Sequence, residues 1–198
     1  MYGFKQITPP AALAVELDTI KTHLRVELTN TTEDDLITML INTAVERVEE
    51  MGTALITQTW DLVMDGWPDT DELRIPRPPL QAITGIYYTP NGGSELEFAS
   101  TNYIVDTFAE PGRVVLHTGV SWPSTTLQRA AGVRVRWVCG YGDAAADVPK
   151  RFAQAIALMC GHWYENREQV VITGAVPKEI PQGAMMLIKL DGTGIKVD

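Results

Sequence analysis

The sequence predicts an α+β fold, in which N- and C-terminal helices pack as a small bundle with an inserted antiparallel β sheet or sandwich. Apolar residues recur at helical spacing up to about residue 53 and again after residue 147, whereas between them they alternate with polar residues in short runs. Of the 198 residues, 45% are apolar and 21% are charged, which is the composition of a chain with an ordinary core. We divide this one domain into N-terminal helices (1–53), a β insertion (54–139), a C-terminal helix that completes the helical body (140–170) and an extended arm (171–198).

Two helices are predicted before the β insertion. The first opens at Thr8-Pro9-Pro10, because proline is tolerated in a first helical turn. The second follows the acidic run Glu33-Asp34-Asp35, whose charge suits the positive end of a helix dipole. Gly52 lies just past the second helix, where glycine readily adopts a left-handed backbone. The apolar faces are Leu13, Leu17, Ile20 and Leu24 in the first helix, and Ile37, Leu40, Ala44, Val48 and Met51 in the second.

A third helix is predicted after the β insertion. It starts near Asp147, a residue type that caps helix N-termini. Beyond Arg167 the chain is punctuated by glycine and proline, which predicts a linker that leads into the arm. The buried stripe of the third helix is Phe152, Ile156, Met159, Cys160 and Trp163.

The β insertion is predicted to form several short antiparallel strands. In the first strand Ile56, Trp60, Leu62 and Met64 share one face, and Asp61 lies on the other. A stretch with three prolines, Leu73–Pro79, is expected to pair only at an edge or to bridge two strands. Further strands are predicted at Leu80–Thr89, Glu95–Phe98, Tyr103–Asp106, Arg113–His117 and Val133–Val138.

The last predicted strand carries two arginines, Arg134 and Arg136, on the face opposite its apolar side chains. They are either the exposed half of a half-buried strand or groups that touch phosphates. The net charge of −9, from 25 acidic and 16 basic residues, argues against a protein that grips nucleic acid. It is compatible with a protein that DNA merely passes, and with ordinary solubility.

No pattern in the sequence indicates catalysis, a metal ion or a cofactor. His23, His117 and His162 fall in three different predicted elements, and His162 shares a helix face with Glu165 without further ligands in view. The common phosphate-loop, nucleophile-elbow, dinucleotide and zinc-protease motifs do not occur in the sequence. We therefore predict that the chain is not an enzyme, although catalytic groups assembled from scattered residues would leave no such signature.

The two cysteines, Cys139 and Cys160, lie among apolar neighbours outside any CxxC spacing, which predicts buried free thiols. Residues 1–10 lack the apolar run of a signal peptide. No apolar run approaches the roughly 18 residues that a membrane-spanning helix needs, so no membrane association is expected.

A series of short motifs extends from Pro9 to Val171. The motifs are His23-Leu24-Arg25-Val26-Glu27, Glu33-Asp34-Asp35-Leu36-Ile37, Ala54-Leu55-Ile56-Thr57-Gln58-Thr59-Trp60, Arg74-Ile75-Pro76-Arg77-Pro78-Pro79-Leu80, Glu110-Pro111-Gly112-Arg113-Val114, Gly140-Tyr141-Gly142 and His162-Trp163-Tyr164-Glu165-Asn166-Arg167-Glu168. In their order and spacing they resemble the phage head–tail connector (adaptor) family, especially its longer members with a β insertion between the helices.

The resemblance implies a structural virion protein that is made in the host cytoplasm and assembles, usually as twelve copies, into a ring below the portal protein. Such a ring joins head to tail, meets a stopper or tail-terminator protein, and extends the channel through which DNA passes without sequence-specific binding. In the family the C-terminal segment commonly docks on the portal. Here the corresponding apolar residues are Met185, Met186, Leu187, Ile188 and Leu190, and Arg134 and Arg136 are candidates to face the channel.

Other interpretations remain open from the sequence. The segment from Gln182 onward is alternatively a frayed tail or a final core helix. The protein is alternatively another neck or tail-completion protein. A third alternative is a prophage-encoded hydrolase or small-ligand binding domain, with a pocket built from Trp60, Tyr87 and Trp137.

Overall fold

The structure, a computed structural model, describes residues 2–167 and 182–189. The described chain forms two compact units, a β unit of residues 2–11 and 57–140 and a helical unit made of the remaining described residues. Helices and antiparallel sheets occur in the predicted order along most of the chain, which confirms the α+β fold class.

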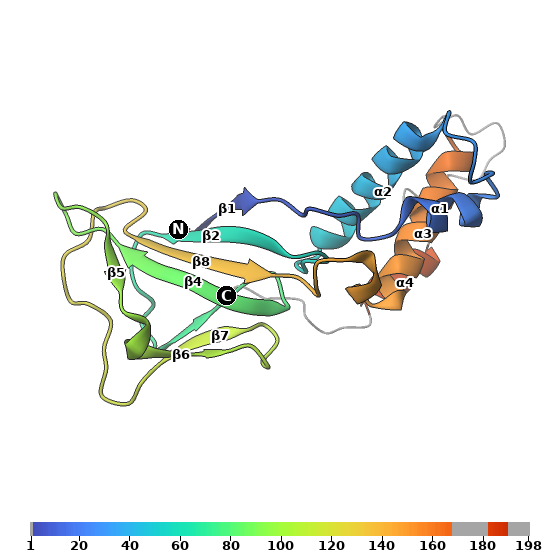
Figure 1. Cartoon of the computed structure of the whole chain (residues 1–198). Coiled ribbons are helices and arrows are strands. Elements are labelled where there is room, and N and C mark those ends of the chain that lie inside the picture. Colours follow the sequence, from blue (N-terminus) through green and yellow to red (C-terminus); the bar gives the residue numbers. More distant parts are fainter. Residues whose placement is uncertain (1, 168–181, 190–198) are drawn as a thin grey trace. The chain divides into compact units, whose positions relative to one another are not determined.

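A five-stranded antiparallel sheet, with the strand order β1-β2-β8-β4-β5, is the main element of the β unit (Figure 1). The last strand in sequence, β8, therefore lies at the centre, between β2 and β4. The five strands are β1 (Tyr2–Thr8), β2 (Gln58–Met64), β8 (Val133–Cys139), β4 (Leu80–Tyr88) and β5 (Leu96–Phe98).

A second, three-stranded antiparallel sheet completes the β unit, with the order β3-β7-β6. Its strands are β3 (Glu72–Arg74), β7 (Arg113–Leu116) and β6 (Tyr103–Asp106), and a short 3₁₀ turn, Ser100–Asn102, precedes β6. The part of the proline-rich stretch that lies in a strand, Leu73 and Arg74, pairs at the edge of a sheet, as predicted, since β3 is an edge strand.

The alternation of β8 decides which face of the large sheet is buried. Val133, Val135 and Trp137 are fully buried, while the side chains between them reach solvent. Leu62 of β2 and Ile86 of β4 lie directly opposite Val135 and are buried on the same face. These cross-strand neighbours form the apolar core row of the sheet.

The helical unit contains α1 (Leu17–Leu24), α2 (Asp34–Glu49), α3 (Lys150–Glu165) and α4 (Gln182–Lys189). A single-turn 3₁₀ helix, Ala145–Asp147, precedes α3. The predicted apolar stripes of α2 and α3 supply most of the core, and Gly52 after α2 has the expected positive φ of 99°. The fully buried core side chains include Ile20, Ile37, Ile41, Ile156 and Met159.

Lys21 on α1 is the principal buried charge of the helical unit. Its ammonium group donates hydrogen bonds to the carbonyl oxygens of Leu28 and Asn30, at 3.0 and 2.8 Å, and to Asp34 Oδ1 at 2.7 Å. All three ammonium protons therefore have acceptors, which is what a buried lysine requires. The same contacts hold the connection between α1 and α2 against the first turn of α2.

The N-terminal region differs from the prediction. Residues 2–8 form strand β1 along β2, and the first helix begins at Leu17 and not near Pro10. β1 has no regular apolar alternation from which the sequence could predict a strand. Its extended conformation depends on backbone pairing with β2. The prediction that Ile56 belongs to the first strand of the β insertion is also wrong. Ile56 is buried in the helical core, and β2 starts two residues later at Gln58.

Two helix ends also need correction. Pro149, and not Asp147, occupies the N-cap position of α3, and the Asp147 carboxylate accepts a hydrogen bond from the Ala144 amide instead. Met51, expected in the buried stripe of α2, lies beyond the end of that helix and is exposed. In both places the helix boundary lies two residues from the predicted position.

The free, buried state of both cysteines is confirmed. Burial raises the pKa of the Cys160 thiol to about 12, which suppresses its nucleophilic thiolate form. Within residues 2–167 and 182–189, no helix is long and apolar enough to cross a bilayer. The same residues contain no cluster of histidine, cysteine and acidic side chains able to hold a metal ion.

We predict that Lys21→Met lowers the free energy of unfolding by about 2–4 kcal/mol, because Asp34 and two carbonyl groups lose their donor. Urea denaturation followed by the circular dichroism of the helices measures the change. Arg47→Met is the control, since its ion pair with Glu50 lies on the surface and its loss costs at most about 0.5 kcal/mol. Equal effects of the two substitutions would contradict the organising role of Lys21.

Candidate interaction surfaces

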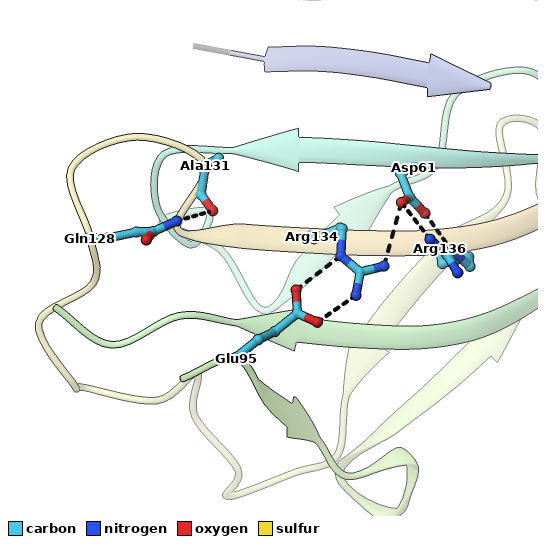
Figure 2. Close-up of polar contacts among 6 residues, drawn as sticks. All are labelled: Asp61, Glu95, Gln128, Ala131, Arg134 and Arg136. Carbon is cyan, nitrogen blue, oxygen red and sulfur yellow. Dashed lines mark hydrogen bonds and ion pairs between the residues drawn. The ribbon is translucent and has the colours of Figure 1, made fainter. Parts of the chain in front are cut away.

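The first candidate surface is the charged face of the large sheet, which lies opposite its apolar core row. Asp61 on β2 is only 4% exposed and faces Arg136 directly across the strand pair. Arg136 donates from Nε to Asp61 Oδ1 at 2.7 Å and from Nη2 to Oδ2 at 2.8 Å, so the pair is bidentate (Figure 2). Arg134 adds a longer contact to Oδ2 at 3.4 Å.

Arg134 connects Asp61 with the opposite side of the same face. Its Nε and Nη2 atoms donate to the two carboxylate oxygens of Glu95 at 3.0 and 2.6 Å (Figure 2). Its guanidinium group lies over the ring of Tyr87, 4.2 Å from the ring centre. One arginine thus bridges β2, β4 and the residue just before β5.

The protonation of Asp61 follows from these contacts. Burial by itself raises the pKa of a carboxyl group, but the hydrogen bonds from Arg136 and the charges of Arg136 and Arg134 outweigh it, and the pKa of Asp61 lies below its ordinary value. Asp61 is therefore ionised at neutral pH. Glu95 has the largest part in raising the pKa of Arg134, and Asp61 has it for Arg136.

The sequence left two interpretations of Arg134 and Arg136 open. In the structure they are the partly exposed residues of a strand whose other side chains are buried. Both guanidinium groups are occupied by Asp61 and Glu95, so they do not stand as free positive charges on this face. Sequence reasoning placed the arginines on the correct face but missed their acidic partners. The one available signal was Asp61 itself, an acidic residue in the middle of an otherwise apolar and neutral strand.

The second candidate surface is α4, where the extended arm was expected. Residues 182–189 form a helix that contacts α3, and Ile188 is buried in the helical core. Met186 is 72% exposed, Met185 is half-buried, and Leu187 packs against the core. An extended arm is therefore wrong for this stretch, because its apolar spacing suits a helix packed on a neighbour. Leu190 and the remainder of the arm lie outside the described residues.

The third candidate surface is a polar cluster at the end of α3. The Tyr164 hydroxyl donates to one oxygen of Glu33, and Arg167 Nη2 donates to the other at 2.9 Å. The hydrogen bonds from Tyr164 and then Arg167 hold the pKa of Glu33 below its usual range, despite partial burial. The sequence indicated only a helix-dipole role for Glu33, since its two partners lie more than 130 residues away.

The three aromatic residues of the alternative pocket do not meet. Trp137 is fully buried, and Trp60 lies opposite it on the same face, with the Arg77 guanidinium 4.0 Å from its ring centre. Tyr87 lies opposite Arg134, on the other face of the sheet. The three side chains therefore cannot line one pocket, and the small-ligand alternative loses the residues on which it rested.

Chains of similar fold occur in solved structures, among them the three described next. A chain in the neck of an empty gene transfer agent (GTA) particle, computed with C6 symmetry, is 22% identical to this chain, with a TM-score of 0.78. A chain in the virion of the native GTA particle is 20% identical, with a TM-score of 0.76. A chain in the neck of the native particle, computed with C12 symmetry, is 21% identical, with a TM-score of 0.70.

Each likeness covers 94% of this chain and 93% of the other, so the two units share a common fold with these chains over almost their whole length. No protein-family model and no curated protein sequence matches the chain.

We predict that Asp61→Asn lowers the free energy of unfolding by about 2–4 kcal/mol at pH 7, because a neutral amide leaves two guanidinium groups without their shared counter-ion. The pKa of Asp61 is lower in the folded than in the unfolded chain, where it is about 4. Its contribution is therefore complete above about pH 4 and is lost as the pH falls through the folded pKa. Urea denaturation at pH 7 and pH 3 measures the change.

The matched control is Asp69→Asn, which makes the same substitution at an exposed aspartate after β2 and changes stability by at most about 0.5 kcal/mol. A destabilisation by Asp61→Asn that stays constant from pH 7 to pH 3 would contradict the ionised pair.

Proposed function

We propose that the chain is a structural protein of the neck of a tailed phage or phage-like particle. More specifically, we infer a head–tail connector (adaptor), which forms a ring below the portal, extends the DNA channel and joins head to tail. The observation that carries this proposal is the fold shared, over 94% of this chain, with a chain in the neck of a GTA particle.

A second line of support comes from the sequence. The ordered motifs from His23 to Glu168 resemble head–tail connectors without any use of the fold. Likeness of fold and likeness of motif order are separate observations, and both lead to the neck. Sharing a fold does not by itself fix a function, so the motif order raises the weight of the proposal.

The proposed subunit acts by assembly and not by catalysis. Copies associate through two different surfaces, which is the kind of contact that closes into a ring. We expect twelve copies, in keeping with the C12 symmetry used for one of the similar neck structures. The portal and a stopper or tail-terminator protein are the proposed neighbours, and the virion neck is the proposed location.

The relation to DNA follows from the charges. The chain has a net charge of −9, and the arginines proposed to face the channel, Arg134 and Arg136, are paired with Asp61 and Glu95. A wall of ion pairs offers phosphates little net attraction, whereas free arginines would retain them. We therefore propose passage of DNA without sequence-specific binding.

The proposed portal contact narrows to the exposed side of α4. Met186 is the most exposed apolar residue of that helix, and Met185 and Leu187 flank it. Ile188 is buried in the helical core, so it can contact the portal only if α4 separates from α3. Methionine side chains suit such a surface because they adapt to irregular partners.

A different neck or tail-completion protein is the second candidate. The similar chains come from the neck and the virion of GTA particles, and this location is compatible with more than one component of the neck. Both candidates are structural parts of the same region of the particle.

We predict that cryo-electron microscopy of purified particles places this chain as a ring directly below the portal. The purified protein is expected to bind assembled portal rings and to gain a defined mass with them, measured by native mass spectrometry. A chain found in the tail tube or absent from the particle, together with a persistent monomer that ignores the portal, would contradict the connector role.

We predict that Met186→Asp weakens binding to portal rings by at least about tenfold, because a charge is placed in a desolvated apolar contact. Binding is measured by surface plasmon resonance with immobilised portal rings. Met39→Asp on α2 is the control, since Met39 is also a helical methionine and is 57% exposed. Equal loss for both variants, or none for either, would remove α4 from the portal contact.

A further inference from the structure

We propose that neighbouring copies of this chain join edge to edge, with β1 of one copy pairing alongside β5 of the next, so that the five-stranded sheet continues from copy to copy. The occupant of each sheet edge is thus a second copy of this chain. The proposal rests on the ring proposed above and names the surfaces that form its lateral contact.

Among residues 2–167 and 182–189, neither edge strand of the large sheet has a partner on its outer side. Within these residues β1 pairs with β2 alone, and β5 pairs with β4 alone. β1 is seven residues long, contains no proline and is exposed over residues 3–8. Large apolar side chains are exposed on both edges: Phe4 at 53% and Leu96 at 46%. Proteins usually protect such edges, because unpaired backbone groups invite another strand.

The two edge strands run in the same direction. Each neighbouring pair in the order β1-β2-β8-β4-β5 is antiparallel, so the first and fifth strands are parallel. A second copy that continues the sheet with the same orientation therefore pairs its β5 in parallel with β1. The two edges differ, so the contact is heterologous and repeats around a ring.

The side chains on the two edges match face by face. Phe4 lies opposite the buried Leu62, and Leu96 shares a face with the buried Phe98, so both belong to the apolar face of the sheet. Lys5 lies opposite Asp61 on the charged face.

Glu97 lies opposite Tyr87 on that same charged face. In parallel pairing, one register therefore places Phe4 beside Leu96 and Lys5 beside Glu97, an apolar pair and an opposite-charge pair together.

The charges also select against the alternative contacts. Lys5 is the central residue of β1 and Glu97 is the central residue of β5. Centred antiparallel pairing of β1 with a second β1 would set Lys5 against Lys5, and β5 with β5 would set Glu97 against Glu97. Like charges placed directly opposite destabilise strand pairs. Among the described residues, no hydrogen bond or ion pair engages the side chain of Lys5 or Glu97, so both are available.

A pair of cysteines tests the contact directly in the full chain. In the double variant Phe4→Cys/Leu96→Cys, parallel neighbours come within disulfide reach, a Cα separation of about 4.4–6.8 Å. Within one copy the two edges are four strand spacings apart, roughly 19 Å, so no disulfide forms inside a copy. The native Cys139 and Cys160 are buried and do not compete.

We expect mild oxidation of the double variant to give a reducible ladder of oligomers that ends at the closed ring on a denaturing gel. Each single variant can form dimers at most. Efficient dimers of Phe4→Cys alone would overturn the proposal in favour of β1 pairing with itself. A double variant without a ladder also overturns it; if the uncrosslinked protein still forms rings by light scattering, the neck role stands and only the edge contact fails.

Charge reversal supplies a second, independent measurement. Lys5→Glu and Glu97→Lys are each expected to weaken self-association about two- to tenfold, and the double reversal to restore it, as sedimentation velocity would show. Both residues are exposed on edge strands, so neither change disturbs the fold. Weakening by both single variants without restoration by the double reversal would overturn the Lys5–Glu97 register.

Discussion

The pairing of Asp61 with Arg136 and Arg134 is the interaction on which the large sheet depends. These partners lie more than 70 residues apart in sequence, and their contact brings β8 into the centre of the sheet beside β2. A shift of one residue would bury the arginines and expose Val133, Val135 and Trp137, because strand faces alternate with period two. The ion pair and the apolar alternation therefore specify the same register, one on each face of the strand.

The helical unit also aligns two segments through a buried charged side chain, which here is a cation and not a carboxylate. Lys21 is buried, and it holds the connection between α1 and α2 through two carbonyl groups and Asp34. A buried charge tolerates few alternative positions, since each one leaves polar groups unsatisfied. In both units apolar residues supply the bulk of the core, whereas a buried charge determines how two segments align.

The sequence predicted the elements whose own pattern is strong. The apolar stripes of α2 and α3 and the alternation of β8 identified those elements to within a few residues. It failed where a partner creates the element: β1 is a strand because β2 pairs with it, and residues 182–189 are a packed helix because α3 covers them. The candidate site followed the same rule. Arg134 and Arg136 were identified from alternation, but their pairing with Asp61 and Glu95 is visible only once the sheet is formed.

The edges of the large sheet pose a problem that its core does not. A strand such as β1 attracts any other extended chain through its backbone, which carries no information about identity or direction. Side chains must supply that information, and a central lysine on one edge with a central glutamate on the other does so with two residues. Each edge then repels its own kind and attracts the other, which favours a directed series of copies over a closed dimer. A subunit that must join only its neighbours in a ring needs this selectivity more than it needs high affinity, because closing the ring adds the contributions of all its contacts.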